Sequence, residues 1–437
     1  MADLKLIARR IFAETLAAID VPSAVERELE LHHGKLRCRH LVFDLREVRE
    51  AKVVCVGKAA HGMAEGLARV LLPEVKFTGV VSAPTKPEKP IAGLTYFAGG
   101  HPVPNEQSWN AAKAILTLLE SCSEQSLVIF LLSGGGSALM EFSLDPAKSL
   151  EDLQALHRVL VGCGASIEEI NTIRKHISAV KGGRLAAAAG RARKLTLAIS
   201  DVPVGKESAL ASGPTLPDPT TCEDVLLLLD KYRLREKLPR SIRDWIALGK
   251  MRETPKPGDP AFANAHFYLL LGMHELFHAA HQAAEAKGFF TCCDNSTDDW
   301  PVEQAANALL DALEELRRNN PGAPVALIAD GEVSSPVTGD GVGGRNSAFV
   351  LACVERIAGK RIAVLSAGTD GIDGNSTAAG AVADGETLQR AEASGMKPRE
   401  YFRNSDAGTF FKKLGDGVET GPTGNNLRDL RILLAAR

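Results

Sequence analysis

The chain has 437 residues, of which 51 are basic and 54 acidic, for a formal net charge of −3. Its 45% hydrophobic content is that of a globular protein with a large core. This composition excludes collagen-like, disordered and disulfide-rich scaffolds, and the near-neutral charge provides no global field that would attract nucleic acid or anionic lipid. Glycine supplies 40 of the 437 residues, about 9%, which is above its usual share of about 7%. Such a surplus indicates places where the backbone turns sharply or approaches a ligand closely.

Short apolar runs alternate with longer amphipathic stretches along the chain, which is typical of α/β domains with parallel sheets. The amphipathic stretches predict helices over residues 3–18, 59–71, 106–119, 150–161, 167–176, 274–286, 302–318 and 346–357. The apolar runs predict strands over residues 52–56, 78–82, 94–97, 127–132, 195–200, 267–271, 324–329 and 361–365.

A linker is predicted over residues 249–264, which contain three prolines and two glycines without an apolar period. At roughly 100–200 residues per domain, the length of the chain itself indicates two or three domains. The linker therefore predicts a domain over residues 1–250 and a second over 251–437.

The sequence predicts a cytoplasmic protein. The longest apolar runs fall far short of the roughly 20 residues of a membrane-spanning helix, and the first residues lack the uninterrupted apolar core of a secretory signal. The eight cysteines form no CxxC pair, and several lie inside apolar runs, so we expect buried, reduced thiols, with zinc ligation or disulfide bonds as the alternatives.

A glycine-rich loop, SGGGS, follows the predicted strand at 127–132. Three successive glycines leave the backbone N–H groups able to converge on an anion. Ligands of open α/β sheets lie outside the carboxyl ends of the strands, so the loop predicts a phosphate or carboxylate site; the alternative is a flexible surface turn. The residues of this predicted site are Ser133, Gly134, Gly135, Gly136 and Ser137.

Several basic side chains also lie next to glycines. Lys58 comes directly after the predicted strand at 52–56, where it can point into a cleft and pair with phosphate oxygens, or simply be solvated at the surface. Residues 171–184 (NTIRKHISAVKGGR) offer Lys175, Lys181 and Arg184 beside a Gly-Gly break. These charges indicate either an anion site or the solvated face of a helix.

Acidic side chains also lie at strand ends. Asp201 ends the run LAISD and precedes Val202-Pro203, which suits a general base or a metal ligand. In the second half, Asp330 and Glu332 follow one predicted strand, and Asp370 and Asp373 follow another. Such pairs suggest Mg²⁺ or hydroxyl recognition, with ordinary turn chemistry as the alternative.

Two literal motifs are weaker indications. Gly339, Gly341 and Gly344 form GxGxxG, but the preceding strand ends about nine residues earlier, whereas a dinucleotide fingerprint follows its strand at once. Residues 274–278 read HELFH, an HExxH zinc motif, without an obvious third ligand downstream. No GxxxxGK[ST] motif is present, which excludes a Walker-type nucleotide site.

Nine blocks in one order resemble a known family, the glycerate 2-kinases that end in a MOFRL domain, some of which are labelled hydroxypyruvate reductases. The resemblance covers nearly the whole chain. The blocks are VGKAAHGMAEG (56–66), GGHPVPNEQS (99–108), FLLSGGGSAL (130–139), INTIRKHISAVKGGRLA (170–186), ISDVP (199–203), ASGPT (211–215), GVGGRNSAF (341–349), SAGTDGIDGNSTAAGAVAD (366–384) and TGPTGNNLRDL (420–430).

The resemblance implies a fold and an activity. The fold is α/β, with two three-layer α/β/α domains: an N-terminal Rossmann-like parallel sheet and a C-terminal domain that contains the MOFRL region at about 322–432, with the active site in the interdomain cleft. The activity is ATP-dependent phosphorylation of D-glycerate to 2-phosphoglycerate, with Mg²⁺ required. The partners are then the small molecules ATP and D-glycerate, with neither nucleic acid nor membrane; a homodimer stays open.

The resemblance also assigns roles to residues. The family's catalytic lysine and aspartate fall on Lys58 and Asp201, and its arginine in the GGRN block falls on Arg345. Metal ligands are expected at Asp201 and Glu332. The other residues expected to bind substrate or nucleotide, besides the SGGGS loop, are His101, Lys181, Arg184, Asp370 and Asp373.

The sequence departs from the family pattern at three places. Lys206 stands after ISDVP where relatives have glycine and acidic residues, Thr377 stands near a usual aspartate, and His274 begins a helix that usually starts with asparagine. Three other functions therefore remain as alternatives: an NAD(P)-dependent hydroxypyruvate reductase, a zinc hydrolase that uses HELFH, and a binding protein without catalysis.

Overall fold

The structure is a computed structural model that describes residues 3–72, 74–200, 202, 205–425 and 427–437. Its contacts divide the chain into two compact units: a first unit, Val21–Leu270, and a second unit, Met1–Asp20 with Leu271–Arg437.

The boundaries of the units differ from the predicted domain limits. The predicted linker, residues 249–264, lies inside the first unit because its polar groups bond there. The Thr254 hydroxyl donates to Asp218 (3.0 Å), and the N–H of Lys194 donates to the carbonyl of Asn264 (2.8 Å). Residues 3–20 belong to the second unit, because the first helix packs on the second sheet.

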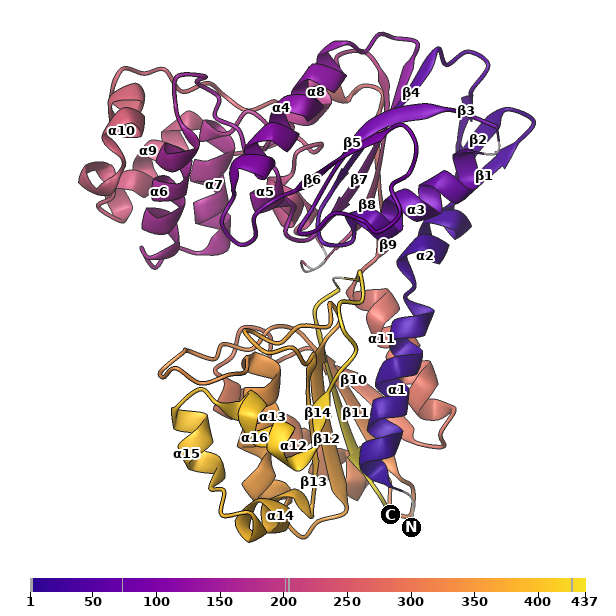
Figure 1. Cartoon of the computed structure of the whole chain (residues 1–437), viewed down its shortest axis with the longest axis vertical. Helices are drawn as coiled ribbons and strands as arrows, with labels where there is room; N and C mark the ends of the chain where they lie inside the picture. Colours follow the sequence, from indigo (N-terminus) through magenta and orange to yellow (C-terminus); the bar gives the residue numbers. More distant parts are fainter. Residues whose placement is uncertain (1–2, 73, 201, 203–204, 426) are drawn as a thin grey trace. The chain divides into compact units, whose positions relative to one another are not determined.

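A six-stranded sheet in the order β6-β5-β4-β7-β8-β9 forms the centre of the first unit (Figure 1). The pairs from β6 to β8 are parallel. Strand β7 is buried along its whole length, which explains its continuous apolar run. The strands are β4 (Glu50–Val56), β5 (Phe77–Ala83), β6 (Leu94–Ala98), β7 (Ser126–Ser133), β8 (Arg193–Ile199) and β9 (Ala265–Leu271).

Helices cover both faces of this sheet. Helices α4 and α8 pack on the face formed by Val54, Val128 and Phe130, while α3 packs on the opposite face. The helices around the sheet are α2 (Val21–Glu28), α3 (Ala60–Leu71), α4 (Glu106–Glu120), α5 (Gly136–Leu139) and α8 (Arg184–Ala188).

A group of four helices lies beside the sheet and has its own apolar core (Figure 1, left). Three of them begin at capping boxes, in which Ser149, Ser166 or Thr221 accepts a backbone N–H and an acidic residue three positions later bonds back. The helices are α6 (Leu150–Val161), α7 (Ile167–Ile177), α9 (Cys222–Lys231) and α10 (Arg240–Ala247).

A small antiparallel sheet of three strands precedes β4 and is absent from the predicted elements. Its first hairpin turns at His33-Gly34, both with positive φ (50° and 71°), as a two-residue hairpin turn requires. The runs are only four residues long and rich in charge, so they lack the apolar signal of the buried strands. The strands are β1 (Leu29–His32), β2 (Lys35–Cys38) and β3 (Leu41–Asp44).

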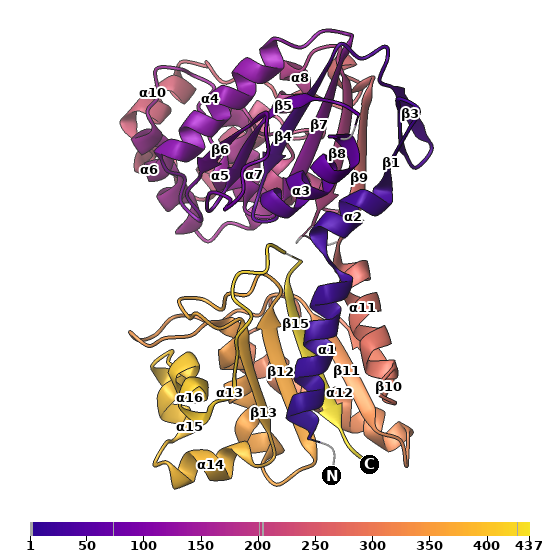
Figure 2. The ribbon, with the colours of Figure 1, turned by 45° about the vertical axis from the view of Figure 1, so that its right-hand side comes forward.

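The second unit is built on a six-stranded mixed sheet in the order β10-β11-β15-β12-β13-β14 (Figure 2). Strands β10 and β11 pair in parallel, whereas β15 is antiparallel to both of its neighbours. The expectation of a parallel sheet is therefore wrong here, because the C-terminal strand enters between β11 and β12. The strands are β10 (Phe290–Asp294), β11 (Val325–Asp330), β12 (Ile362–Gly368), β13 (Gly380–Asp384), β14 (Gly417–Val418) and β15 (Asp429–Ala435).

Helices again form two outer layers. Helices α12 and α13 pack on one face of the mixed sheet, and α1 and α11 pack on the other (Figure 2). The helices of this unit are α1 (Leu4–Ala18), α11 (Met273–Glu285), α12 (Val302–Asn319), α13 (Arg345–Ile357), α14 (Thr387–Ala393), α15 (Pro398–Arg403) and α16 (Ala407–Leu414).

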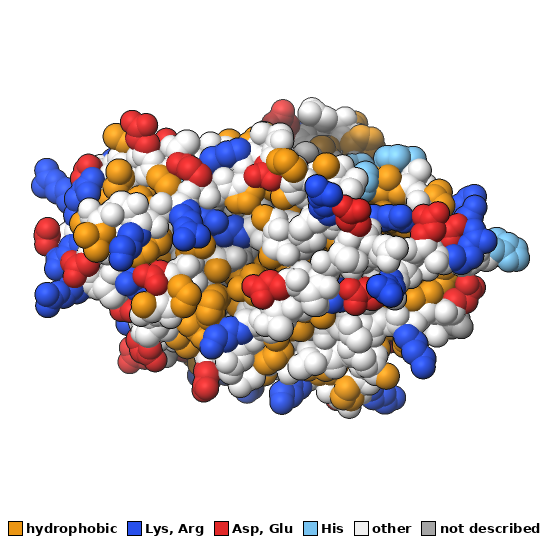
Figure 3. All heavy atoms as spheres, turned by 90° about the horizontal axis from the view of Figure 1, so that it is seen from above, with side chains coloured by type: hydrophobic (Ala, Val, Ile, Leu, Met, Phe, Trp, Pro, Cys, Tyr) orange, Lys and Arg blue, Asp and Glu red, His pale blue; other side chains and the backbone are white. Residues whose placement is uncertain are grey.

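The predicted α/β fold class, with two sheets each covered by helices, is confirmed. None of the helices in the described part of the chain combines the length and the apolar character needed to cross a membrane. Acidic and basic side chains are interspersed on the face shown in Figure 3, as the near-zero net charge leads one to expect.

Candidate active site

The loops that follow β4, β7 and β8 lie at one edge of the first sheet. These strands are parallel and in register, with Val56 beside Leu132 and Ser133 beside Ile199. Their carboxyl ends therefore carry Lys58, the SGGGS loop and Ser200 at the same level. Asp201, the next residue after Ser200, lies outside the described residues.

Gly57 allows the turn after β4 to pack closely against the SGGGS loop. Its φ is +135°, and a Cβ at this position would lie 2.0 Å from the Ser133 hydroxyl oxygen, so no other residue fits. That hydroxyl accepts the N–H of Ala59 (3.0 Å), and the N–H of Lys58 donates to the carbonyl of Gly134 (2.9 Å). The backbone of Lys58 is thereby fixed against the glycine loop.

Gly135 is the point where three predicted site residues meet. Its φ is +80°, and a Cβ built on it would lie 3.1 Å from Cδ2 of His101 and 3.3 Å from Cγ of Lys58. The side chains of Lys58 and His101 thus lie over a bare stretch of backbone. Helix α5 begins at Gly136, and the first N–H groups of a helix have no acceptor within it. A lysine beside such N–H groups suits an anion.

A second loop, which contains Ala211 and Ser212, contacts the SGGGS loop. The hydroxyls of Ser137 and Ser212 lie 2.7 Å apart, and Ser212 donates to Oδ1 of Asn171 (3.1 Å). Ala211 and Ser212 have φ of 49° and 61°, a left-handed conformation that is uncommon and costly outside glycine. Asn171 and Ser212 were not among the predicted site residues, although both lie in blocks that carry the resemblance.

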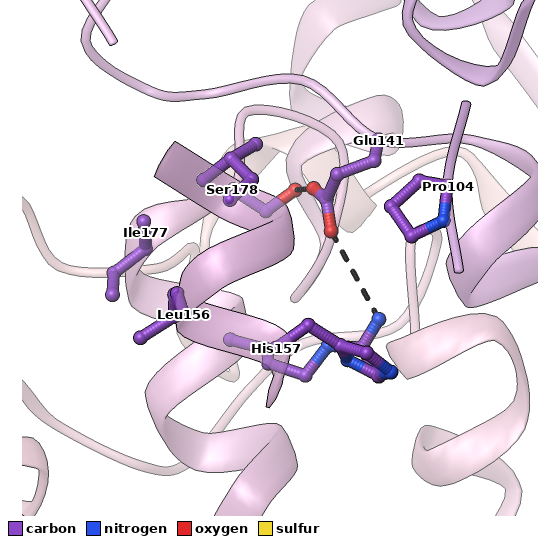
Figure 4. Close-up of a pocket in the computed structure, with 8 residues that line it drawn as sticks. Pro104, Glu141, Leu156, His157, Ile177 and Ser178 are labelled. Carbon is purple, nitrogen blue, oxygen red and sulfur yellow. Dashed lines mark hydrogen bonds and ion pairs between the residues drawn. The ribbon is translucent and has the colours of Figure 1, made fainter. Parts of the chain in front are cut away.

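A buried cluster of charges contacts the SGGGS loop at Ser137. Lys181 is fully buried and pairs with Glu141 at 2.5 Å, while Arg174 lies 3.9 Å from the same carboxylate and donates to the carbonyl of Ser137 (3.3 Å). Ser178 also donates to Glu141 (2.8 Å), as Figure 4 shows. Two cations thus share one carboxylate, which leaves net positive charge beneath the SGGGS loop. Burial lowers the pKa of Lys181 to about 8, against the pull of Glu141.

The two other predicted basic residues have structural contacts as well. Lys175 pairs with Asp218 (3.4 Å). Arg184 donates to the backbone carbonyls of Arg252 (3.0 Å) and Glu253 (3.3 Å). Lys181 and Arg184 therefore hold parts of the first unit together, and the structure places neither of them over Gly135 as it does Lys58 and His101.

In the second unit, Arg345 is held by carboxylates. It is the first residue of α13, and its Nη1 and Nη2 each lie 2.7 Å from an oxygen of Glu332. Its Nε lies 2.5 Å from Asp429, the first residue of β15. Burial lowers the pKa of Arg345, but the carboxylates of Asp429 and Glu332 outweigh this effect and raise it above its usual range.

Asp370 lies at the edge of the second sheet that also carries Asp429, whereas Asp373 caps helix α13. A Cβ on Gly368 would lie 3.0 Å from Oδ1 of Asp370 and 3.4 Å from Oδ1 of Asp429. The Asp373 carboxylate accepts three backbone N–H groups at the start of α13, from Gly344 (3.1 Å), Asn346 (2.9 Å) and Ser347 (2.8 Å). Burial raises the pKa of Asp373, against these hydrogen bonds.

Residues 7–247 match a family described as a domain of unknown function (DUF4147), and residues 325–429 match the MOFRL family. A D-glycerate 2-kinase of Thermotoga maritima is 37% identical over 87% of this chain and 89% of its own. This chain belongs to the glycerate kinase family.

Other relatives agree with that assignment to the glycerate kinase family. A solved structure of a Thermotoga maritima glycerate kinase (EC 2.7.1.31) is 34% identical, covers 99% of both chains and has a TM-score of 0.84. A protein of Agrobacterium vitis named putative hydroxypyruvate reductase is 34% identical over 98% of this chain and 94% of its own. The resemblance inferred from the nine blocks is confirmed. So is the use of two names, glycerate kinase and hydroxypyruvate reductase, among the relatives.

The structure explains the two literal motifs of the sequence, GxGxxG and HELFH. The GxGxxG loop precedes α13 but does not follow β11 directly, since β11 ends at Asp330. Among the described residues, His274, Glu275 and His278 join no cluster of three metal donors, and Glu275 instead accepts the N–H of Gly272 (2.8 Å) to cap α11. Lys206, one of the departures, forms an ion pair with Glu168.

Proposed function

We propose that this protein is an ATP-dependent glycerate kinase that transfers the γ-phosphoryl group of ATP to the 2-hydroxyl of D-glycerate, giving 2-phosphoglycerate. The observation that carries the proposal is the edge of the first sheet. There Lys58 and His101 lie over Gly135 in a glycine loop, in a chain whose relatives are named glycerate kinases.

Phosphoryl transfer depends mainly on positioning and on neutralising charge. The phosphates of ATP carry several negative charges. In this proposal, the N–H groups of residues 133–137, the Lys58 ammonium and the net positive charge of the buried cluster offset them. The glycine loop suits this role because a side chain at Gly135 would occupy the space next to Lys58 and His101.

The substrate hydroxyl needs an acceptor for its proton. We propose that the Asp201 carboxylate orients the 2-hydroxyl and takes that proton while the oxygen bonds to the γ-phosphorus and the bond to the β,γ-bridging oxygen breaks. ADP then leaves with the electron pair of the broken bond. Arginine carries five N–H groups. We propose that Arg345 in the second unit binds the carboxylate of glycerate with the N–H groups that its contacts with Glu332 and Asp429 leave over.

Mg²⁺ would lower the negative charge of the phosphates when bound. Carboxylate oxygens are its preferred protein ligands. Both oxygens of Glu332 already face the Arg345 guanidinium at 2.7 Å, so Glu332 does not fit a metal in this arrangement. We therefore propose Asp201 as a metal ligand and Glu332 as the ion-pair partner of Arg345.

The test is a coupled assay of ADP release by the purified chain with ATP, Mg²⁺ and D-glycerate, with NADH and hydroxypyruvate in a parallel reaction. We expect glycerate-dependent ADP release and no NADH consumption. NADH consumption without ADP release would support a reductase and contradict the proposal, and release that is independent of glycerate would contradict the substrate.

A further inference from the structure

Three chemically different metal donors meet in the first unit, among its helical group. His176 lies in the last turn of α7, Cys222 is the first residue of α9, and Glu253 lies in the segment before β9. One donor atom from each lies within 4.8 Å of the other two, and His176 Nε2 is 3.6 Å from Oε2 of Glu253.

The imidazole of His176 is already arranged as a ligand. Its Nδ1 lies 2.9 Å from the carbonyl oxygen of Thr172, which can only accept, so Nδ1 carries the proton and Nε2 of the neutral ring presents a lone pair. His176 is completely buried, and among the described residues its Nε2 has no hydrogen-bond partner. A buried polar atom of this kind calls for a partner. A carbonyl on the other ring nitrogen is the usual arrangement for a metal-bound histidine.

Glu253 is held beside the thiol. Its Oε1 accepts the N–H of Cys222 (2.8 Å), and its Oε2 pairs with Lys256 (2.7 Å). Zinc at Oε2 would replace this ion pair, and Lys256 would keep its hydrogen bonds to the carbonyl of Thr220 and the hydroxyl of Thr254. The side chain of Glu253 is 49% exposed, which gives an ion a path from solution.

The donor set selects among metals. A thiolate, an imidazole and a carboxylate are all ligands of Zn²⁺, whereas Mg²⁺ prefers oxygen alone. Zinc bonds of about 2.0–2.3 Å place ligand atoms roughly 3.3–3.8 Å apart in a tetrahedron. The 3.6 Å between His176 and Glu253 already fits this range. Rotation of the partly exposed Cys222 and Glu253 side chains would bring the sulfur into it.

We propose that His176, Cys222 and Glu253 form a Zn²⁺ site with three protein ligands and a fourth position open to water. This site is separate from the glycine loop and from the proposed kinase chemistry. It would join α7, α9 and residues 249–264. Since α7 also carries Arg174 and Asn171, which contact Ser137 and Ser212, bound zinc would stabilise the helix that supports the SGGGS loop.

The experiment uses the full chain, freed of metal by chelation and without nucleotide. Zn²⁺ is titrated in competition with a chromophoric chelator, and the melting temperature is measured with and without Zn²⁺. We expect one equivalent of Zn²⁺ to bind and to raise the melting temperature. Cys222→Ser should weaken binding by about 100-fold, and Glu253→Gln by at least about 10-fold, in line with the cost of disturbing metal ligation.

The control is the double variant Cys292→Ser, Cys293→Ser. These two exposed thiols lie in the second unit, where the Cys293 sulfur is 3.7 Å from Nδ1 of His281, another contact between a thiol and an imidazole. This variant should still bind one equivalent. Zinc binding that survives Cys222→Ser but is lost in the double variant would overturn the proposal, as would the failure of the wild-type chain to compete for Zn²⁺.

Co²⁺ provides a readout that does not depend on the stability of a variant. Bound at this site, Co²⁺ should show a thiolate-to-metal charge-transfer band in the wild-type chain and in the Cys292, Cys293 variant. A wild-type spectrum without that band would contradict ligation by Cys222.

Discussion

The edges of the two sheets carry similar sequence signals but satisfy their polar groups differently. At the first edge, backbone contacts hold the turn of Lys58 against the SGGGS loop, and the side chains of Lys58 and His101 lie over Gly135. At the second edge, Arg345 is bound by Glu332 and Asp429. Similar sequence signals therefore occur at a glycine loop covered by two side chains and at a network of ion pairs, and only the contacts distinguish the two.

The largest effects are expected at the first edge. Lys58→Ala and Asp201→Asn should each lower kcat by at least about 100-fold, since each removes a charge or a proton acceptor from the reacting groups. Melting temperatures should stay near that of the wild type. Lys237→Ala, at an exposed lysine, is the control and should be fully active. Near-normal turnover in both site variants would contradict the assignment of this edge.

At the second edge, we expect Arg345 to act in the reaction and Asp373 to act in stability. Arg345→Lys keeps the positive charge but loses the fork, and we expect kcat/KM for glycerate to fall by roughly 100-fold. Asp373→Ala removes the cap of α13 and should cost about 1–2 kcal/mol of unfolding free energy, with kcat little changed. Urea unfolding and steady-state kinetics measure both. The reverse pattern, with Asp373 essential for turnover and Arg345 dispensable, would exchange their roles.

A pair of glycine variants tests whether the loop needs the space or only the backbone conformation. Gly135 and Gly164 have nearly equal φ, +80° and +78°, but a Cβ has nothing within 4 Å at Gly164, whereas at Gly135 it meets His101 and Lys58. Either change to alanine should cost about 1–2 kcal/mol through the left-handed backbone. Only Gly135→Ala should raise the KM for ATP, by about 10-fold or more. Equal kinetics in the two variants would remove Gly135 from the site.

The smallest effect concerns the buried cluster and its pH dependence. Because the pKa of Lys181 is lowered to about 8 from 10.5, the unfolded chain binds a proton that the folded chain has lost between these two values. The free energy of unfolding should therefore rise with pH across this window. Lys181→Met should remove that slope, and Lys237→Met should leave it. Denaturant unfolding at several pH values measures it, and an unchanged slope in Lys181→Met would exclude Lys181 as its source.

Much of the fold could be predicted because burial leaves local signals. The strand of residues 127–132 and the helix of residues 150–161 are recognisable from an apolar run and from a capping serine with helical periodicity. Strands β1–β3 and β13 are short, charged or made of small residues, so they carry little such signal. The position of β15 between β11 and β12 depends on pairing across distant parts of the chain, which periodicity cannot report.

The site could be predicted where a residue directly follows a strand, and could not where its partners are distant in the sequence. Residues directly after a strand, such as Lys58 and Ser133, could be placed at an edge by the rule for parallel sheets. The partners of Lys181 and Asp373 lie 40 and 26–29 residues away, so nothing near them in the sequence shows that Glu141 and the start of α13 engage them. The His176, Cys222 and Glu253 cluster was missed for the same reason, because its three donors come from separate segments.

Phosphorus NMR of the product that the wild-type chain forms from ATP, Mg²⁺ and D-glycerate tests the proposed reaction directly. We expect the resonance of 2-phosphoglycerate, which appears together with ADP and is absent from the Lys58→Ala reaction. A phosphoglycerate signal of equal intensity from Lys58→Ala, or no phosphorylated glycerate from the wild-type chain, would contradict it.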